Sequence, residues 1–205
     1  MRKFLFFFLL ISVSFQAQTK MSNPEAEALK TLVKEQALTT KTISSKFTQY
    51  KHLDFLSNEI VTKGILAFKT PDLVKWAYTD PYKYTVIFKN ETLYINDEGN
   101  KNEVNMGSNK LFKQLNGLII NSIKGDMFDD DAFKIEYFKS DKNSLVYFIP
   151  KDKKSSKFIN AFHITFNPKG DVIEVKMIEP SGDFTKIVFT NKELNKPLAD
   201  AIFTN

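Results

Sequence analysis

The stretch FKTPDLVKWAYTDP, residues 68–81, holds the only tryptophan of the chain in a short extended run between two prolines. Successive side chains of a strand point to opposite faces, so Val74, Trp76 and Tyr78 share one face while Lys75 lies on the other. The first face is strongly aromatic. Such a face either belongs to an ordinary core or lines a cavity for an apolar guest, and alternation is compatible with both.

The chain has the length and composition of one globular domain. Its 205 residues are 42% hydrophobic and include 20 phenylalanines, which is enough apolar side chain for a sizeable core. Seven glycines and seven prolines are too few for a fibrous or low-complexity protein. No shift in composition divides the chain, so we expect a single domain over residues 19–205.

Residues 1–18 have the pattern of a signal peptide. Arg2 and Lys3 precede an apolar run at 4–13, and SFQAQ at 14–18 supplies the small and polar residues of a cleavage site. The apolar run is about ten residues long, whereas a membrane-spanning helix needs about 20. Cleavage is therefore the expectation and a retained anchor the alternative. We expect an exported chain in a bacterial periplasm, and without cysteine it has neither disulfides nor a lipid-modified cysteine.

The charge of the exported chain argues against nucleic acid as a partner. The formal net charge is +5, and it falls to +3 when Arg2 and Lys3 are removed with the signal peptide. So small a charge is no electrostatic footprint of nucleic-acid binding. Arg2 is also the only arginine, so bidentate recognition of phosphate or carboxylate by a guanidinium group is excluded after cleavage.

Hydrophobic periodicity predicts a β-rich fold with two helices. Residues 22–38 and 108–124 have apolar side chains at helical spacing, and a short helical turn is expected at 195–203. Alternating runs predict strands around Trp76 and at 42–53, 60–69, 83–90, 91–97, 100–105, 132–138, 144–150, 158–168, 171–179 and 183–191. We expect a mainly β protein of the α+β class, in which antiparallel strands form a strongly curved sheet or incomplete β-barrel covered by a helical lid.

The sequence offers little for catalysis. His52 and His163 are the only histidines, and without cysteine they cannot assemble a conventional zinc site. Phosphate-binding glycine loops and the nucleophile motif G-x-S-x-G are absent, and the acidic run at 129–131 lacks the ligand spacing of a calcium loop. Paired carboxylates from distant strands, as in glycoside hydrolases, are the catalytic arrangement that the sequence leaves open. We expect no enzyme activity, no cofactor and no metal.

Other apolar side chains extend the aromatic face of the Trp76 strand onto its neighbours. The residues that can project together are Phe47, Leu66, Phe68, Val74, Trp76, Tyr78, Tyr84, Val86, Phe88 and Tyr94. A filled barrel and a hollow one show the same alternation, so the residues themselves leave core and cavity open as alternatives.

Four segments, taken in order, resemble the LolA family of periplasmic lipoprotein carriers. They are ISSKFTQ (43–49), KGILAFKTPDLVKWAYTDP (63–81), TLYIND (92–97) and GDVIEVKMIEPSGDFTKIVFTN (170–191). The 43–49 segment resembles the family's F-x-Q strand, and the 63–81 segment resembles its G-x-L/F-x-F/V strand with the following P-x-x-x-x-W. The 92–97 segment is similar to a short aromatic strand of the family, and the 170–191 segment is similar to its closing hairpin.

The resemblance implies an incomplete antiparallel barrel closed by helices, with an apolar cavity for acyl chains. Family members accept acylated lipoproteins from an inner-membrane exporter and take them to an outer-membrane acceptor. Burying acyl chains is worth about 0.8 kcal/mol per methylene, so such cargo needs a shield in water. We expect a monomer that binds acylated lipoproteins or lipids. The residues expected to line the cavity are Phe47, Leu66, Phe68, Trp76, Tyr78 and Phe88. Those expected at the lid or mouth are Thr70, Leu73, Val74, Leu111, Leu115 and Leu118.

One position departs from the family pattern. The family often has an arginine immediately before the first proline of the 68–81 stretch, thought to hold the lid, whereas this chain has Thr70, preceded by Lys69. The lid contact therefore cannot be carried over. Two alternatives keep the fold and change the role. One is a carrier of a lipid or hydrophobic metabolite, and the other is a regulatory domain that senses lipoproteins by binding a membrane-anchored partner.

Overall fold

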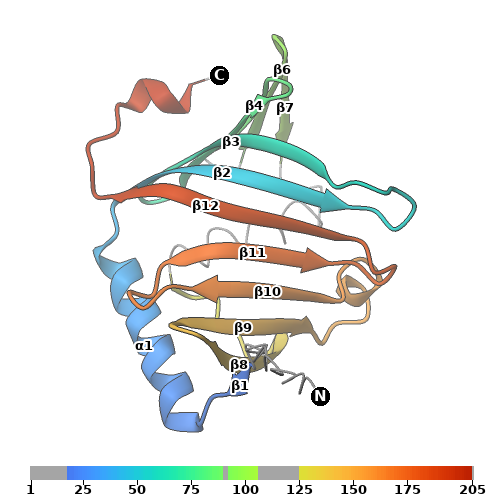
Figure 1. Ribbon diagram of the computed structural model, residues 1–205. Coiled ribbons are helices and arrows are strands. Elements are labelled where there is room, and N and C mark those ends of the chain that lie inside the picture. The colour runs from blue at the N-terminus through green and yellow to red at the C-terminus, as the bar shows by residue number, and fades with distance from the viewer. Residues whose placement is uncertain (1–17, 90–91, 106–124, 205) are drawn as a thin grey trace, which may run out of the picture.

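Twelve antiparallel strands form a single curved sheet in the computed structural model, which describes residues 18–89, 92–105 and 125–204. The strands are β1 (Thr19–Lys20), β2 (Thr42–His52), β3 (Ile60–Lys69), β4 (Leu73–Asp80), β5 (Tyr84–Lys89), β6 (Thr92–Asp97), β7 (Asn100–Asn105), β8 (Phe133–Ser140), β9 (Asn143–Pro150), β10 (Ala161–Phe166), β11 (Val172–Ile178) and β12 (Phe184–Leu194). Their order across the sheet is β1-β8-β9-β10-β11-β12-β2-β3-β4-β5-β6-β7 (Figure 1). Within the described residues the sheet is open, with β1 and β7 at its edges.

The pairing of β12 with β2, which we call the seam, joins the two halves of the chain. β2–β7 follow one another on one side of the seam, and β8–β12 follow one another on the other. At the seam Phe189 lies opposite Phe47 and Ile187 lies opposite Gln49. Side chains that are about 140 residues apart in the sequence therefore share one face of the sheet, because directly opposed residues of an antiparallel pair point the same way.

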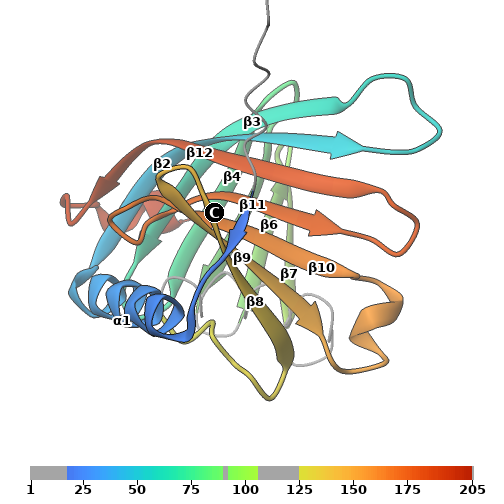
Figure 2. The ribbon, with the colours of Figure 1, turned by 60° about the horizontal axis from the view of Figure 1, so that its bottom comes forward.

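One α-helix, α1 (Asn23–Thr39), is present in the described residues and packs against the concave face of the sheet (Figure 2). The Glu25 carboxylate accepts hydrogen bonds from the backbone N–H (2.9 Å) and hydroxyl (2.8 Å) of Ser22, and it pairs with Lys139 of β8. Leu29 and Val33 form the buried face of the helix together with Ala26. The helix predicted at 22–38 is therefore confirmed. None of the described helices is long and apolar enough to span a membrane.

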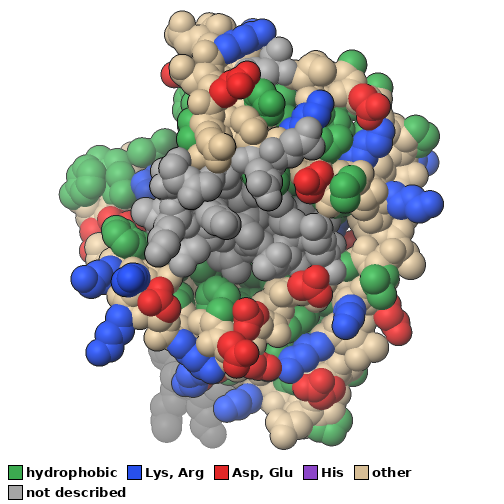
Figure 3. Space-filling model, turned by 180° about the vertical axis from the view of Figure 1, so that it is seen from behind, with side chains coloured by type: hydrophobic (Ala, Val, Ile, Leu, Met, Phe, Trp, Pro, Cys, Tyr) green, Lys and Arg blue, Asp and Glu red, His purple; other side chains and the backbone are tan. Residues whose placement is uncertain are grey.

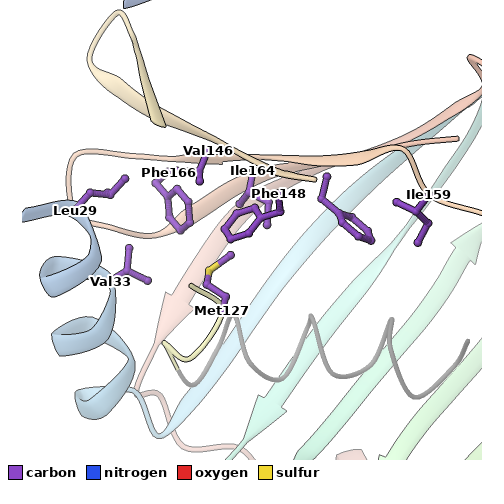
Figure 4. Packing of buried hydrophobic residues seen from close by; sticks show 9 residues of the cluster. Leu29, Val33, Met127, Val146, Phe148, Ile159, Ile164 and Phe166 are labelled. Carbon is purple, nitrogen blue, oxygen red and sulfur yellow. The ribbon is translucent and has the colours of Figure 1, made fainter. Parts of the chain in front are cut away.

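The concave face carries two clusters of buried hydrophobic residues. The first, beneath α1 and β8–β11, consists of Leu29, Val33, Met127, Val146, Phe148, Ile159, Phe162, Ile164 and Phe166 (Figure 4). The second, on the other side of the seam, consists of Ile43, Phe47, Leu66, Phe68 and Val74, with Trp76, Tyr78, Phe88, Ile187, Phe189 and Leu194 packed against it. The aromatic face predicted from the 68–81 stretch belongs to this second cluster.

The convex face has a smaller cluster beneath the C-terminal segment. Phe203 of the short 3-10 helix η3 (Asp200–Phe203) is buried with Ala67 and Ile87. Two lysines hold this segment in place. The Lys69 ammonium donates to Asp200 Oδ1 at 2.6 Å, and the Lys75 ammonium donates to the Ile202 carbonyl oxygen at 3.0 Å.

Within the described residues the sheet is open and curved, as expected, whereas the helical lid is not confirmed. The structure departs from the sequence-based expectations in two other respects. β1 and the short 3-10 helix η2 (Ser155–Lys157) were not predicted. Tyr94 was expected on the aromatic face, but it lies opposite Ile87 and belongs to the convex side. The helix predicted at 108–124 lies outside the described residues, as do the first 17 residues of the predicted signal peptide.

Candidate apolar cavity

An apolar cavity of about 130 Å³ lies between α1 and the concave face, at the seam. Its apolar lining residues are Val33 and Ala37 of α1, Ile43 of β2, Leu66 of β3, Trp76 of β4, Val172 and Val175 of β11, and Ile187, Phe189 and Leu194 of β12. A dry apolar cavity of about 150 Å³ is large enough to bind benzene. The cavity as it stands therefore accommodates a ring or a short stretch of one alkyl chain.

Trp76 contributes an aromatic wall to this cavity and contacts two other rings, of which Phe47 lies behind it and Phe189 also borders the cavity. It is stacked on Phe47, with 4.3 Å between the ring centroids, and Phe189 meets it edge to face at 6.1 Å. Phe47 is itself only 1% exposed. Stacking and edge-to-face contacts each add about 0.5–1.5 kcal/mol to the burial of the rings. The tryptophan is thus fixed on the side facing the core and borders space on the other.

A glycine of β3 makes room for the Phe47 ring. A Cβ added to Gly64 would lie 2.4 Å from Cζ of Phe47 and 2.2 Å from the carbonyl oxygen of Ala77. Gly64 lies opposite Phe47 in the sheet, so the ring lies directly over the glycine. The aromatic wall therefore depends on a position that no larger residue can occupy without displacing Phe47.

The glutamine of the F-x-Q motif accepts a hydrogen bond within the same face. The Tyr78 hydroxyl donates to Gln49 Oε1 at 3.0 Å, and Tyr78 meets Phe47 edge to face at 5.4 Å. Burial raises the pKa of Tyr78, so the phenol is protonated and able to donate at any physiological pH. The motif thus places on one face an aromatic ring and a polar anchor for Tyr78 of β4, which lies two strands away.

Polar groups at the border of the cavity are already paired. The Ser45 hydroxyl donates to the Thr190 carbonyl oxygen (2.9 Å), and the Thr40 hydroxyl donates to the Gln36 carbonyl oxygen (2.7 Å). At the rim, Lys192 Nζ lies 3.1 Å from Asp171 Oδ1. Because these groups bind each other or the backbone, the cavity offers an apolar guest no unpaired buried donor or acceptor from them.

The structure brings together most of the residues expected to line a cavity, but only two border this one. Leu66 and Trp76 are lining residues. Phe47 and Phe68, each 1% exposed, lie in the core behind them. Tyr78 and Phe88 are partly buried and pack against the same cluster.

The residues expected at the lid or mouth are more dispersed. Val74 is buried in the second cluster. Thr70 is exposed at the β3–β4 turn, where its N–H donates to the Lys41 carbonyl oxygen at 2.9 Å. Leu73 lies on the convex face, in the cluster with Phe203. Leu111, Leu115 and Leu118 lie outside the described residues.

The sequence patterns did not predict that residues of α1 and β12 line the cavity. Val33 of α1 and the β12 residues Ile187 and Phe189 all border it. The helical spacing at 22–38 and the alternation at 183–191 predicted a helix and a strand at these positions. Neither pattern says that β12 pairs with β2, and that pairing is what creates the cavity.

Comparison with known families agrees with this architecture. The model of the family described as outer membrane lipoprotein carrier protein LolA matches residues 38–205. The chain belongs to the LolA family. No curated protein sequence matches it. Among the described residues, no group of three or more histidine, cysteine, aspartate or glutamate side chains could hold a metal ion.

Three solved structures share the fold at low sequence identity. A DUF1329 family protein from Desulfovibrio piger is 13% identical, with a TM-score of 0.51 over 87% of this chain and 96% of that one. The lipoprotein LppX from Mycobacterium tuberculosis is 8% identical, with a TM-score of 0.51 over 87% of this chain and 99% of that one. MucB is 10% identical, with a TM-score of 0.52 over 90% of this chain and 64% of that one. These structural similarities concern the fold of this chain alone.

Proposed function

We propose that this LolA family member carries the acyl chains of lipoproteins across a periplasm, from an exporter in the inner membrane to an acceptor at the outer membrane. The observation that carries the proposal is the apolar cavity at the seam, which has Trp76 in its wall and α1 along one side. Membership of the LolA family and the signal-peptide pattern of residues 1–18 support it. The role requires binding and release, and no bond is made or broken.

Cargo binding requires the cavity to widen, and the contacts of α1 suggest how. The N-terminal part of the helix is held by the ion pair of Glu25 with Lys139 and by the burial of Leu29. The C-terminal part supplies Gln36 and Ala37 to the cavity wall. In our proposal an entering acyl chain displaces this C-terminal part from the β12 side while the N-terminal part stays in place. The displacement breaks the hydrogen bond that the Asn195 side chain, directly after β12, donates to the Thr39 carbonyl oxygen (3.1 Å). Each methylene that enters gains about 0.8 kcal/mol, which offsets the lost helix contacts.

Fluorescence of Trp76 tests the proposal directly, because no other indole contributes. A diacylated peptide added to the protein should shift the emission to shorter wavelength and raise its intensity, whereas the same peptide without acyl chains should change nothing. Trp76→Ala should weaken binding of the acylated peptide about tenfold, since part of the buried apolar surface is lost. Tyr50→Ala on the convex face is the matched aromatic control and should bind as the wild type does. Unchanged emission with the acylated peptide and unchanged binding by Trp76→Ala would refute the proposal.

The contents of the native protein distinguish this role from its alternatives. Mass spectrometry of protein purified from its own periplasm should find acylated lipoproteins or their acylated N-terminal peptides. Free lipid or a hydrophobic metabolite would instead assign the same cavity to another cargo. A stoichiometric membrane-anchored protein with an empty cavity would favour the regulatory role.

A further inference from the structure

A second hollow opens from the apolar cavity at the end of the sheet where the β8–β9 and β10–β11 turns lie. We call it the turn groove. It is lined by these two turns, the last residues of β12 and one residue of α1, and its volume is about 760 Å³. The residues that line both the cavity and the groove are Gln36, Asp171, Val172, Phe189, Lys192 and Leu194. The apolar cavity and the turn groove are therefore continuous.

The β10–β11 turn lies directly against α1 beside the groove (Figure 1). A Cβ added to Gly170 would lie only 3.1 Å from Cγ of Leu32, so a residue larger than glycine would push the turn and the helix apart. The Asn167 side chain holds the turn from within, because its Oδ1 accepts hydrogen bonds from the backbone N–H groups of Lys169 (2.9 Å) and Asp171 (3.0 Å). The turn thus presents Lys169 to the groove from a fixed backbone.

Three lysines line the turn groove, whereas its acid is already bound. The lysines are Lys142, Lys169 and Lys192, and Asp171 is the single acid among the described lining residues. Oδ1 of Asp171 lies 3.1 Å from Lys192 Nζ, and its Oδ2 accepts a hydrogen bond from Asn167 Nδ2 at 3.2 Å. The ammonium groups of Lys142 and Lys169 form neither an ion pair nor a hydrogen bond in the part of the chain that the structure describes. These two lysines are therefore available to an anionic ligand.

Neighbouring acids reduce the positive charge of the groove but do not cancel it. Glu193 faces the convex side of the sheet, because Leu194 after it packs against the second concave cluster. Asp141 lies in the β8–β9 turn without lining the groove, and Lys34 and Glu35 of α1 cancel each other. With Asp141 counted, three lysines still face two acids, one of which is bound to a lysine.

The groove suits a short peptide better than a single small anion. Sites of about 300–1,000 Å³ bury a drug-sized ligand, so a groove of about 760 Å³ holds several residues. The side-chain amides of Gln36 and Asn143 form no hydrogen bond in the described part of the chain, and each can donate and accept, as the peptide backbone requires. An acyl chain in the cavity is joined to the polar part of its molecule, and the groove is where the cavity continues.

We propose that the turn groove binds the first residues of the cargo polypeptide, directly after its acylated N-terminus, and favours acidic side chains there. Lys142 and Lys169 pair with these side chains, while the amides of Gln36 and Asn143 bind the peptide backbone. The inference rests on the proposed carrier role. It adds to that role a preference among lipoproteins, which is set by the residues next to the acyl chains.

Titration of Trp76 emission with two diacylated peptides tests this preference. The peptides carry the same acyl chains and differ only in having two aspartates or two asparagines after the acylated residue. At low ionic strength the wild type should bind the aspartate peptide about fivefold more tightly, the gain typical of two exposed ion pairs, and added salt should reduce this ratio. The double variant Lys142→Gln with Lys169→Gln should bind both peptides with equal affinity.

The opposite end of the strands supplies matched controls. Lys153→Gln with Lys154→Gln makes the same charge change in the segment between β9 and β10, and this variant should keep the preference for aspartate. Phe55, which is 79% exposed, belongs to the β2–β3 hairpin, where Figure 3 shows hydrophobic side chains gathered. Phe55→Ser should also keep the preference, because the hairpin loop does not line the groove.

Cross-linking checks where the peptide lies. Activation of the bound aspartates with a carbodiimide should join them to Lys142 or Lys169, as mapped by mass spectrometry. Cross-links confined to other lysines would contradict the inference. So would a double variant that loses binding of phosphatidylglycerol but keeps the preference for the aspartate peptide, because the two lysines would then serve a lipid headgroup.

The same titration separates failure of this inference from failure of the carrier role. If both peptides change the Trp76 emission of the wild type with equal affinity, the groove does not select acidic residues and the carrier role stands. If neither peptide changes the emission, the carrier role fails and the inference fails with it.

Discussion

The Phe47 and Trp76 rings stack on each other but have different surroundings. Truncating each of them to alanine should therefore lower the free energy of unfolding by a different amount. Phe47 is almost completely buried, whereas Trp76 borders the cavity. Phe47→Ala should lower the free energy of unfolding by about 3–5 kcal/mol, the usual cost of deleting a core aromatic ring. Trp76→Ala should cost clearly less, because fewer atoms pack against its outer side. Urea denaturation followed by far-UV circular dichroism measures both. Equal losses would mean that Trp76 is ordinary core.

Gly64 is another residue at which a small substitution should lower the stability of the protein markedly. An added methyl group would overlap the Phe47 ring and the Ala77 carbonyl oxygen, so ring and backbone must both shift. We expect Gly64→Ala to lower the free energy of unfolding by about 1–3 kcal/mol or more. Lys63→Ala, one position earlier on an exposed side chain, should change it by less than about 0.5 kcal/mol. If the two variants are equally stable in the same denaturation assay, the ring does not need the glycine.

At the scale of elements, the attachment of α1 to β8 should depend on pH. Hydrogen bonds from Lys139 and from Ser22 lower the pKa of Glu25 from 4.5 to about 2. A carboxyl group with a depressed pKa in the folded state stabilises that state fully above its unfolded pKa and loses this effect as the pH falls through the folded value. The contribution of Glu25 should therefore be complete above about pH 5 and vanish towards pH 2.

Thermal unfolding of Glu25→Gln checks this expectation. The variant should melt below the wild type at pH 6, and the difference in melting temperature should shrink steadily as the pH approaches 2. The scans belong at low ionic strength, since Glu25 is exposed and salt screens its interaction with Lys139. A difference that stays constant from pH 6 to 2 would show that the carboxylate charge is not what attaches the helix.

Alternation in the sequence was sufficient to locate most strands and to assign their faces. The runs predicted at 60–69 and 100–105 coincide with β3 and β7, and the shared face of Val74, Trp76 and Tyr78 is confirmed. Tyr94 shows where the assignment of faces from alternation fails. Its strand was correctly placed, but the face it presents is set by its register with β5, and a shift of one residue moves a side chain to the other face.

The cavity itself was beyond prediction from these patterns for a related reason. Its walls come from α1, β2–β4 and β11–β12, and the β12–β2 pairing brings them together. Periodicity indicates which side of a helix or strand is apolar. Which strand it pairs with depends on the packing of the whole chain. The contacts of Lys69, which precedes Thr70, likewise depend on the packing of the whole chain. The described contacts of the Lys69 ammonium are with the C-terminal segment, at Leu198 and Asp200.

At the scale of the molecule, one continuous sheet links both concave clusters, so we expect them to unfold together. Phe148 is fully buried in the first cluster, and Trp76 reports on the second. Phe148→Ala should lower stability by about 3–5 kcal/mol, and the urea midpoint seen by Trp76 fluorescence should fall as far as the midpoint seen by circular dichroism. A fluorescence midpoint that stays at the wild-type value would divide residues 19–205 into two units.

The sheet, which is open within the described residues, also has a consequence for self-assembly. Backbone donors and acceptors at an unpaired sheet edge can recruit a strand from another copy, and proteins oppose this with short, polar or charged edge strands. β1 has two residues, and β7 reads NKNEVN with every residue exposed except Val104. These two edges of the described sheet should therefore pair poorly with each other. Replacing the asparagines of β7 with valine would give this chain a template for polymerisation, without altering its cavity.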